Sequence, residues 1–162
     1  MVEQELTFSE AIRDAIAQQM RSDKRIFVMG EDVQISVFGA TRGLVEEFGP
    51  ERVRNTPISE AGFVGAGAGA AASGMIPVVE ILFADFLTVA FDQIVNQVAK
   101  MRYMFGGKMK LPIIIRTSFG GGSSGAAQHS QSPYSWLMNV PGLKIVIPSN
   151  PSDAKGLMKT SL

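Results

Sequence analysis

The most constraining feature of this 162-residue sequence is that short apolar runs alternate with longer segments of helical pattern. Buried strands that are separated by crossover helices run parallel, with helices packed on both faces of the sheet. The predicted fold is therefore an α/β domain with a doubly wound, mainly parallel sheet. The predicted strands cover 25–30, 52–55, 76–82, 111–115 and 143–147.

Helices are predicted from apolar periodicity and from residues that favour helix ends. Thr7 and Glu10 match a capping box for a helix that continues to about Arg21. Ser59 is the expected N-cap of another helix, which Gly74 closes. The remaining predicted helices cover 41–48, 86–103 and 152–162.

Composition narrows the class of function. Fifteen basic and fifteen acidic residues give a net charge of zero, which provides no electrostatic reason to expect nucleic acid or an anionic membrane as a partner. The sequence has no cysteine, which excludes disulfides and thiolate metal sites. The N-terminus is acidic and unlike a signal peptide, and the small-residue stretch 61–75 is too short to span a bilayer. We expect a single globular domain over 1–162 with a cytoplasmic location of the bacterial type.

Two glycine-rich motifs match known patterns only formally. The glycines at 65, 67 and 69 lie inside a predicted helix, whereas the dinucleotide fingerprint requires a tight turn directly after a strand. Close helix packing is therefore the favoured interpretation. Ser123 lies in a G-x-S-x-G pattern with His129 after it, but no acid lies between them in chain order. A flexible backbone loop over 119–131 is favoured over a hydrolase site.

Glu60 and His129 stand in more informative positions. In open parallel sheets, ligands bind at the carboxyl ends of strands, and both residues follow predicted strands. Glu60 is either an acid that the helix macrodipole favours or a carboxylate that hydrogen-bonds a nitrogen heterocycle. His129, the only histidine, is a candidate acid, base or hydrogen-bond donor. No second histidine or cysteine stands at metal-ligand spacing, so no metal site is predicted.

Six segments carry a family resemblance. In chain order they read GEDV (30–33), TPISE (56–60), EILFADF (80–86), FDQIVN (91–96), QHSQ (128–131) and PGLKIV (141–146). Together they resemble the beta subunit of thiamine diphosphate-dependent 2-oxo acid dehydrogenases and acetoin dehydrogenases. The match covers nearly the whole chain and corresponds to the transketolase-like pyrimidine-binding domain of that family. In the family a C-terminal domain follows, and it has no counterpart up to Leu162.

The resemblance implies roles for five residues. Glu60 matches the glutamate that hydrogen-bonds the aminopyrimidine ring of the cofactor and promotes loss of the thiazolium proton. Phe86 matches the aromatic residue that stacks on the pyrimidine, and Ile58 lies in the matching turn. His129 matches a histidine that handles the substrate or the incoming lipoyl group. Glu31 matches an acid near the cofactor.

The resemblance also implies partners. In the family, a Gly-Asp-Gly motif on the alpha subunit holds the diphosphate and its magnesium, and this sequence has no such motif. The chain would then hold half of a thiamine diphosphate site and be inactive alone. The implied partners are an alpha-type subunit in a heterotetramer, a lipoyl acyltransferase core, and further copies of this chain that approach through the Gly/Ala helix.

The implied reaction is decarboxylation of a 2-oxo acid, or cleavage of acetoin, with acyl transfer to lipoamide. The substrate remains open among acetoin, pyruvate and branched-chain 2-oxo acids. The remaining ligands of a potassium site found in some relatives would lie beyond Leu162, so we do not expect that site to form. The alternative is a catalytically inactive isolated domain that acts only in oligomerisation.

Overall fold

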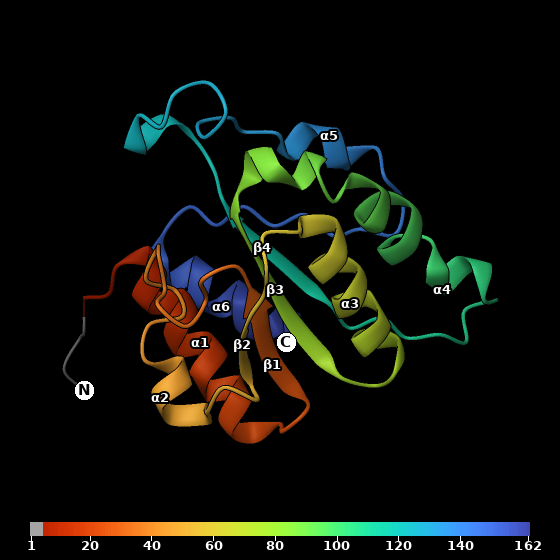
Figure 1. Ribbon diagram of the computed structural model, residues 1–162, viewed down its shortest axis with the longest axis horizontal. Coiled ribbons are helices and arrows are strands. Elements are labelled where there is room, and N and C mark those ends of the chain that lie inside the picture. Colours follow the sequence, from red (N-terminus) through yellow and green to blue (C-terminus); the bar gives the residue numbers. More distant parts are fainter. Residues whose placement is uncertain (1–4) are drawn as a thin grey trace.

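The computed structural model describes residues 5–162 and contains a four-stranded parallel sheet in the order β2-β1-β3-β4 (Figure 1). Each neighbouring pair of strands is parallel, so the predicted doubly wound sheet is confirmed. The chain moves outward from β1 to β2 and then returns to the other side of β1. The order therefore reverses between β1 and β3, and such switch points are where these sheets bind ligands. The strands are β1 (Ile26–Gly30), β2 (Val53–Asn55), β3 (Ile76–Phe83) and β4 (Ile114–Ser118).

Helices cover both faces of the sheet, and each face has its own core (Figure 1). On one face, α1 (Phe8–Ser22) lies beside α6 (Pro151–Ser161), with α2 (Leu44–Phe48) nearby. On the other face, α3 (Glu60–Ala72) packs on β3. None of the helices in residues 5–162 is long and apolar enough to cross a bilayer.

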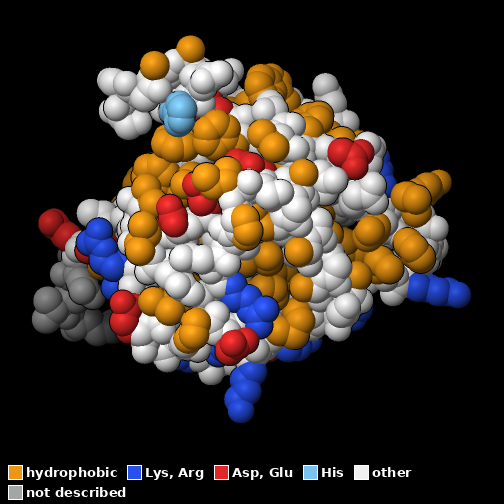
Figure 2. All heavy atoms as spheres, viewed as in Figure 1, with side chains coloured by type: hydrophobic (Ala, Val, Ile, Leu, Met, Phe, Trp, Pro, Cys, Tyr) orange, Lys and Arg blue, Asp and Glu red, His pale blue; other side chains and the backbone are white. Residues whose placement is uncertain are grey.

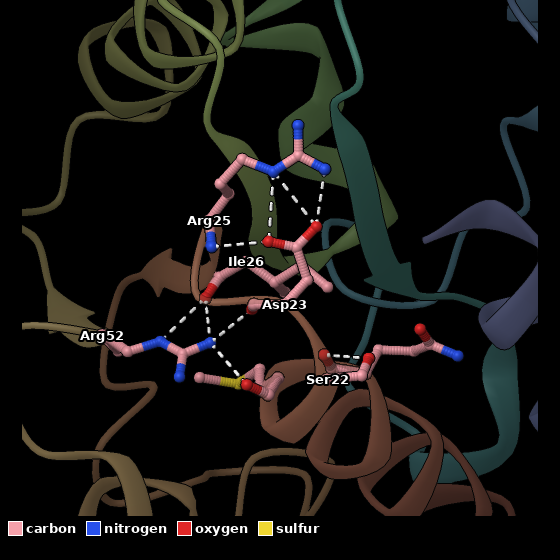
Figure 3. A network of polar contacts seen from close by, with 7 residues as sticks. Ser22, Asp23, Arg25, Ile26 and Arg52 are labelled. Atoms are coloured by element: carbon pink, nitrogen blue, oxygen red, sulfur yellow. Dashed lines mark hydrogen bonds and ion pairs between the residues drawn. The ribbon is translucent and has the colours of Figure 1, made fainter.

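A polar network fixes the start of β1 (Figure 3). The Arg52 guanidinium donates hydrogen bonds of 2.7–3.0 Å to the backbone carbonyls of Met20, Asp23 and Ile26. Arg25 pairs with the Asp23 carboxylate at 2.6 Å. Because Arg52 comes from the chain just before β2, this network ties α1 and the first two strands together.

The predicted helix ends are partly confirmed. In the capping box of α1, the Thr7 amide donates to Glu10 Oε2 at 2.9 Å and the Glu10 amide donates to Thr7 Oγ1 at 3.4 Å. Gly74 ends α3 with a positive φ of 95°, as a C-terminal glycine does. Ser59 occupies the predicted N-cap position of α3, but its hydroxyl accepts no capping hydrogen bond and its backbone (φ −163°, ψ 77°) differs from normal N-cap geometry.

The helix predicted over 86–103 is wrong as a single element. The chain instead forms a 3₁₀ helix η1 (Ala84–Thr88), a π-helix η2 (Gln93–Val98) and α4 (Met101–Met104). The Ala99 amide donates to the Ile94 carbonyl, five residues back, which widens the turn. Ile94 is buried in the core, whereas α4 has no buried residue. Core packing therefore does not hold the C-terminal part of this segment in one continuous α-helix.

Two strand predictions also need correction. β4 is shifted three residues along the chain from the predicted range 111–115, because its ladder with β3 runs from Ile114 to Ser118. The ladder can include Arg116 because its charge is paired with Glu80. The strand predicted over 143–147 is an unpaired segment, and its residues 144–147 are exposed. It follows α5 (Tyr134–Met138) and leaves β4 at the edge of the sheet.

Candidate functional site

The predicted site residues gather at the carboxyl edge of the sheet. Glu31 directly follows β1, and Glu60 begins α3 after β2. Phe86 lies in η1 directly after β3, and His129 lies in the loop after β4. Ile58, in the turn before α3, is 76% exposed. Because all four strands are parallel, the segments that follow them meet at one edge.

Two carboxylates lie close together at this edge. Glu60 is only 7% exposed although it is charged, and it lies at the N-terminus of α3, where the helix dipole favours a negative group. Burial raises the pKa of the Glu31 carboxyl, and the charges of Asp32 and Glu60 raise it further. Their carboxylate oxygens can accept hydrogen bonds from a ligand that binds at this edge. Residues 5–162 contain no group of three or more acidic or histidine side chains arranged to hold a metal ion.

The Thr56 hydroxyl, in the turn before Glu60, is buried without a hydrogen-bond partner among residues 5–162. The Thr56 amide donates to the Gly30 carbonyl at 3.0 Å, which places Thr56 beside the end of β1. A buried hydroxyl without a partner is costly, so this position is suited to a ligand with a polar group.

The histidine sits in an aromatic cluster formed by Phe38, Phe83, Phe86 and His129. The His129 ring lies edge-on to Phe83 with centroids 4.6 Å apart, and edge-on to Phe86 with centroids 5.3 Å apart. Phe83 also packs against Phe38 and Phe86, at 5.2 and 5.8 Å. Figure 2 shows the histidine (pale blue) against hydrophobic side chains (orange). The structure thus brings together two of the predicted residues, Phe86 and His129.

The loop after β4 has a defined conformation. It includes the short 3₁₀ helix η3 (Gly121–Ser123), followed by two residues of positive φ, Ser124 at 54° and Ala126 at 62°. A Cβ atom added at Gly125 would lie 2.8 Å from the Cβ of His129. Ser123 is therefore in an exposed turn rather than on a strand–turn–helix elbow, which removes the basis for a hydrolase.

Sequence reasoning missed three residues that shape this site. Phe83 supplies the shortest aromatic contact to His129. Asp85 is 6% exposed and accepts hydrogen bonds from the side-chain and main-chain nitrogens of Gln131, at 2.7 and 3.3 Å. Phe83, Asp85 and Gln131 all lie within the segments that carried the family resemblance. The hydrogen bond between Asp85 and Gln131 spans 46 positions, so no local sequence pattern indicates it.

This arrangement defines a class of protein: a parallel α/β domain that presents acids, an aromatic cluster and a histidine at the ligand-binding edge of its sheet. The chain belongs to the family described as transketolase, pyrimidine binding domain, which matches residues 4–162. The family predicted from the sequence motifs is thereby confirmed.

Two beta subunits show comparable similarity to this chain. The beta subunit of acetoin:2,6-dichlorophenolindophenol oxidoreductase from Bacillus subtilis (strain 168) is 47% identical over 171 residues, covering 97% of this chain and 50% of the relative. The beta subunit of 2-oxoisovalerate dehydrogenase from the same organism is 47% identical over 159 residues, covering 97% of this chain and 49% of the relative. The chain therefore spans about half the length of the curated relatives it matches.

A solved structure supports the same fold. A split gene transketolase, described as an inactive beta4 tetramer, superposes with a TM-score of 0.75 and 23% sequence identity. The alignment covers 98% of this chain and 48% of the other. At this identity the comparison supports the fold alone.

Proposed function

We propose that this chain binds the aminopyrimidine half of thiamine diphosphate as part of a beta-type subunit. The observation that carries this proposal is the 7% exposed Glu60 carboxylate at the carboxyl edge of the sheet. A ring nitrogen of the pyrimidine would provide the hydrogen-bond partner for that carboxylate. The unpaired Thr56 hydroxyl, close to the same edge, supports a polar ligand there.

Thiamine diphosphate, when bound, supplies the carbanion that attacks a carbonyl carbon. Glu60 would hold the proton that its carboxyl shares with the pyrimidine ring. Phe86 would cover one face of the ring and exclude water, and the exposed Ile58 would contact it from the preceding turn. His129, fixed against Phe86, would hydrogen-bond or protonate the substrate oxygen. Glu31, whose pKa burial raises, would be a second acid beside Glu60 near the cofactor.

The proposal includes a partner. An alpha-type subunit with a Gly-Asp-Gly motif would hold the diphosphate and magnesium, so this chain alone would be inactive. The face of α3 has room for a close approach by another subunit, because a Cβ added at Gly69 would meet no atom within 4 Å. The assembly would be a heterotetramer in the cytoplasm that passes acyl groups to the lipoamide of an acyltransferase core. Acetoin, pyruvate and a branched-chain 2-oxo acid are equally supported as substrates, since a pyruvate dehydrogenase E1 beta subunit from Rickettsia felis is also 47% identical.

The test is turnover by the complex of this chain with a Gly-Asp-Gly alpha subunit. Glu60→Gln should lower kcat by about 10²–10⁴-fold, the range for loss of a proton-transfer group, and leave the fold intact. Glu46→Gln is the matched control, because Glu46 is an exposed acid on α2 on the opposite face of the sheet. Unchanged kcat in Glu60→Gln would refute the proposal. A folded complex without any activity would instead support the oligomerisation role.

A further inference from the structure

We propose that Asp85 is a positioning residue that fixes the His129 loop through Gln131. The consequence for catalysis rests on the proposed function, whereas the hydrogen bonds between Asp85 and Gln131 do not depend on it. Asp85 lies in η1, one residue before Phe86, and Gln131 lies two residues after His129. The hydrogen bonds between Asp85 and Gln131 therefore join the two segments whose aromatic rings meet in the cluster.

The loop has few other attachments to the domain. Residues 121–124 and 126–128 are exposed. Its backbone hydrogen bonds are internal, such as the one from the Gly120 amide to the Gln131 carbonyl at 3.0 Å. Among residues 5–162, the hydrogen bonds that join this loop to the rest of the domain both end on Asp85 Oδ1. Asp85 thus provides the polar anchor, and the phenyl rings provide the apolar contact.

The chemistry of the anchor explains why an acid occupies a buried position. An ionised carboxylate only accepts hydrogen bonds, and both Gln131 groups donate to the same oxygen. Hydrogen bonds to a charged acceptor are stronger than neutral ones. Asparagine would keep one acceptor oxygen at this position, whereas alanine would keep none. The pair Asp85→Asn and Asp85→Ala therefore separates loss of charge from loss of the anchor.

The consequence for catalysis is positional. If the anchor is lost, the His129 ring can move away from Phe83 and Phe86. A displacement of about 1 Å at a reacting group can cost about 10²-fold in rate. We therefore expect Asp85→Ala to lower kcat in the complete complex by about 10–10²-fold with little change in cofactor affinity, and Asp85→Asn to restore most of it.

A direct test uses the fact that His129 is the only histidine. Its Cε1 proton gives a single NMR resonance, which ring currents from Phe83 and Phe86 displace from the position in the unfolded chain. In Asp85→Ala we expect the resonance to move most of the way to the unfolded position. Exchange of the Gln131 amide should become at least about tenfold faster, the factor that loss of a hydrogen bond corresponds to. Asp85→Asn should keep most of the displacement.

The control is Asp92→Ala, because Asp92 accepts a 2.7 Å hydrogen bond from Asn96 in the same part of the chain and is not bonded to the loop. If Asp85→Ala fails to fold, Gln131→Ala, at an exposed residue, removes the 2.7 Å side-chain bond to Asp85 and leaves only the 3.3 Å main-chain bond. An unmoved His129 resonance with unchanged amide exchange in Asp85→Ala would overturn the proposal, and so would an unmoved resonance in Gln131→Ala.

The outcomes also separate this proposal from the proposed function. If the His129 resonance of Asp85→Ala moves toward the unfolded position and turnover stays normal, the result would support the anchor and refute the role of His129. A fixed resonance with reduced turnover would overturn the anchor and leave the role of His129 intact.

Discussion

The interior side of α3 offers the sharpest test of how this sequence encodes its fold. A Cβ atom added at Gly67 would lie 2.7 Å from Val79 Cγ2 and 3.3 Å from Ile113 Cδ1. Val79 is fully buried on β3, and its β-branched side chain has little freedom to rotate away. Glycine at this position therefore lets the helix approach the sheet more closely than any other residue allows.

The expected effect of Gly67→Ala combines two opposing contributions. Alanine gains up to about 1 kcal/mol of helix propensity over glycine. The overlap with Val79 costs about 2–3 kcal/mol, the upper part of the range for overpacked cores. We expect a net loss of about 1–2 kcal/mol in the free energy of unfolding, which corresponds to a Tm lower by about 2–8 °C for a chain of this size.

The matched control lies two residues further along the same helix. A Cβ at Gly69 would meet no atom within 4 Å, so Gly69→Ala should gain the propensity without the overlap. We expect it to raise the free energy of unfolding by up to about 1 kcal/mol. Urea denaturation and thermal melting measure both variants. If Gly67→Ala is as stable as Gly69→Ala, the close packing of α3 on β3 is wrong.

Two further predictions concern charged pairs. Arg116→Met leaves Glu80, which is 2% exposed, without its ionic partner, and we expect a loss of about 3–5 kcal/mol in urea denaturation. The double variant with Glu80→Leu should recover most of this loss, and a single variant as stable as the wild type would contradict the buried pair. Hydrogen bonds from Arg25 lower the pKa of Asp23 from its ordinary value of 3.8 to about 2. The pKa of Asp23 is lower in the folded than in the unfolded chain, so this pair stabilises the fold above about pH 4 and the stabilisation is lost as the pH falls toward 2. The free energies of unfolding of the wild type and Asp23→Asn should therefore differ at about pH 5 and converge near pH 2.

Local patterns in the sequence predict the parallel sheet and the first helix well. The capping box of Thr7 and Glu10 depends on residues three positions apart, and the structure forms it. The apolar run at 143–147 is misleading, because a strand also needs a neighbour with which to pair. The helix predicted over 86–103 fails for a related reason, since its C-terminal part has the right pattern but no core to pack against.

The candidate site shows the same limit. The alternation of strands and helices in the sequence predicts a parallel sheet. In such a sheet Glu31, Glu60, Phe86 and His129 lie at one edge, because each follows a strand. Contacts between distant segments are not encoded in any window of the sequence. The bonds from Gln131 to Asp85 span 46 positions and become visible only when η1 and the loop after β4 are placed side by side.

The central claim is that this chain provides half of a thiamine diphosphate site. Calorimetry with thiamine diphosphate and magnesium, on this chain alone and then mixed with a Gly-Asp-Gly alpha subunit, tests it most directly. We expect binding only in the mixture, and weaker binding when the mixture contains Glu60→Gln. Equal binding by the chain alone, or no binding in a mixture that forms a stable complex, would contradict the claim.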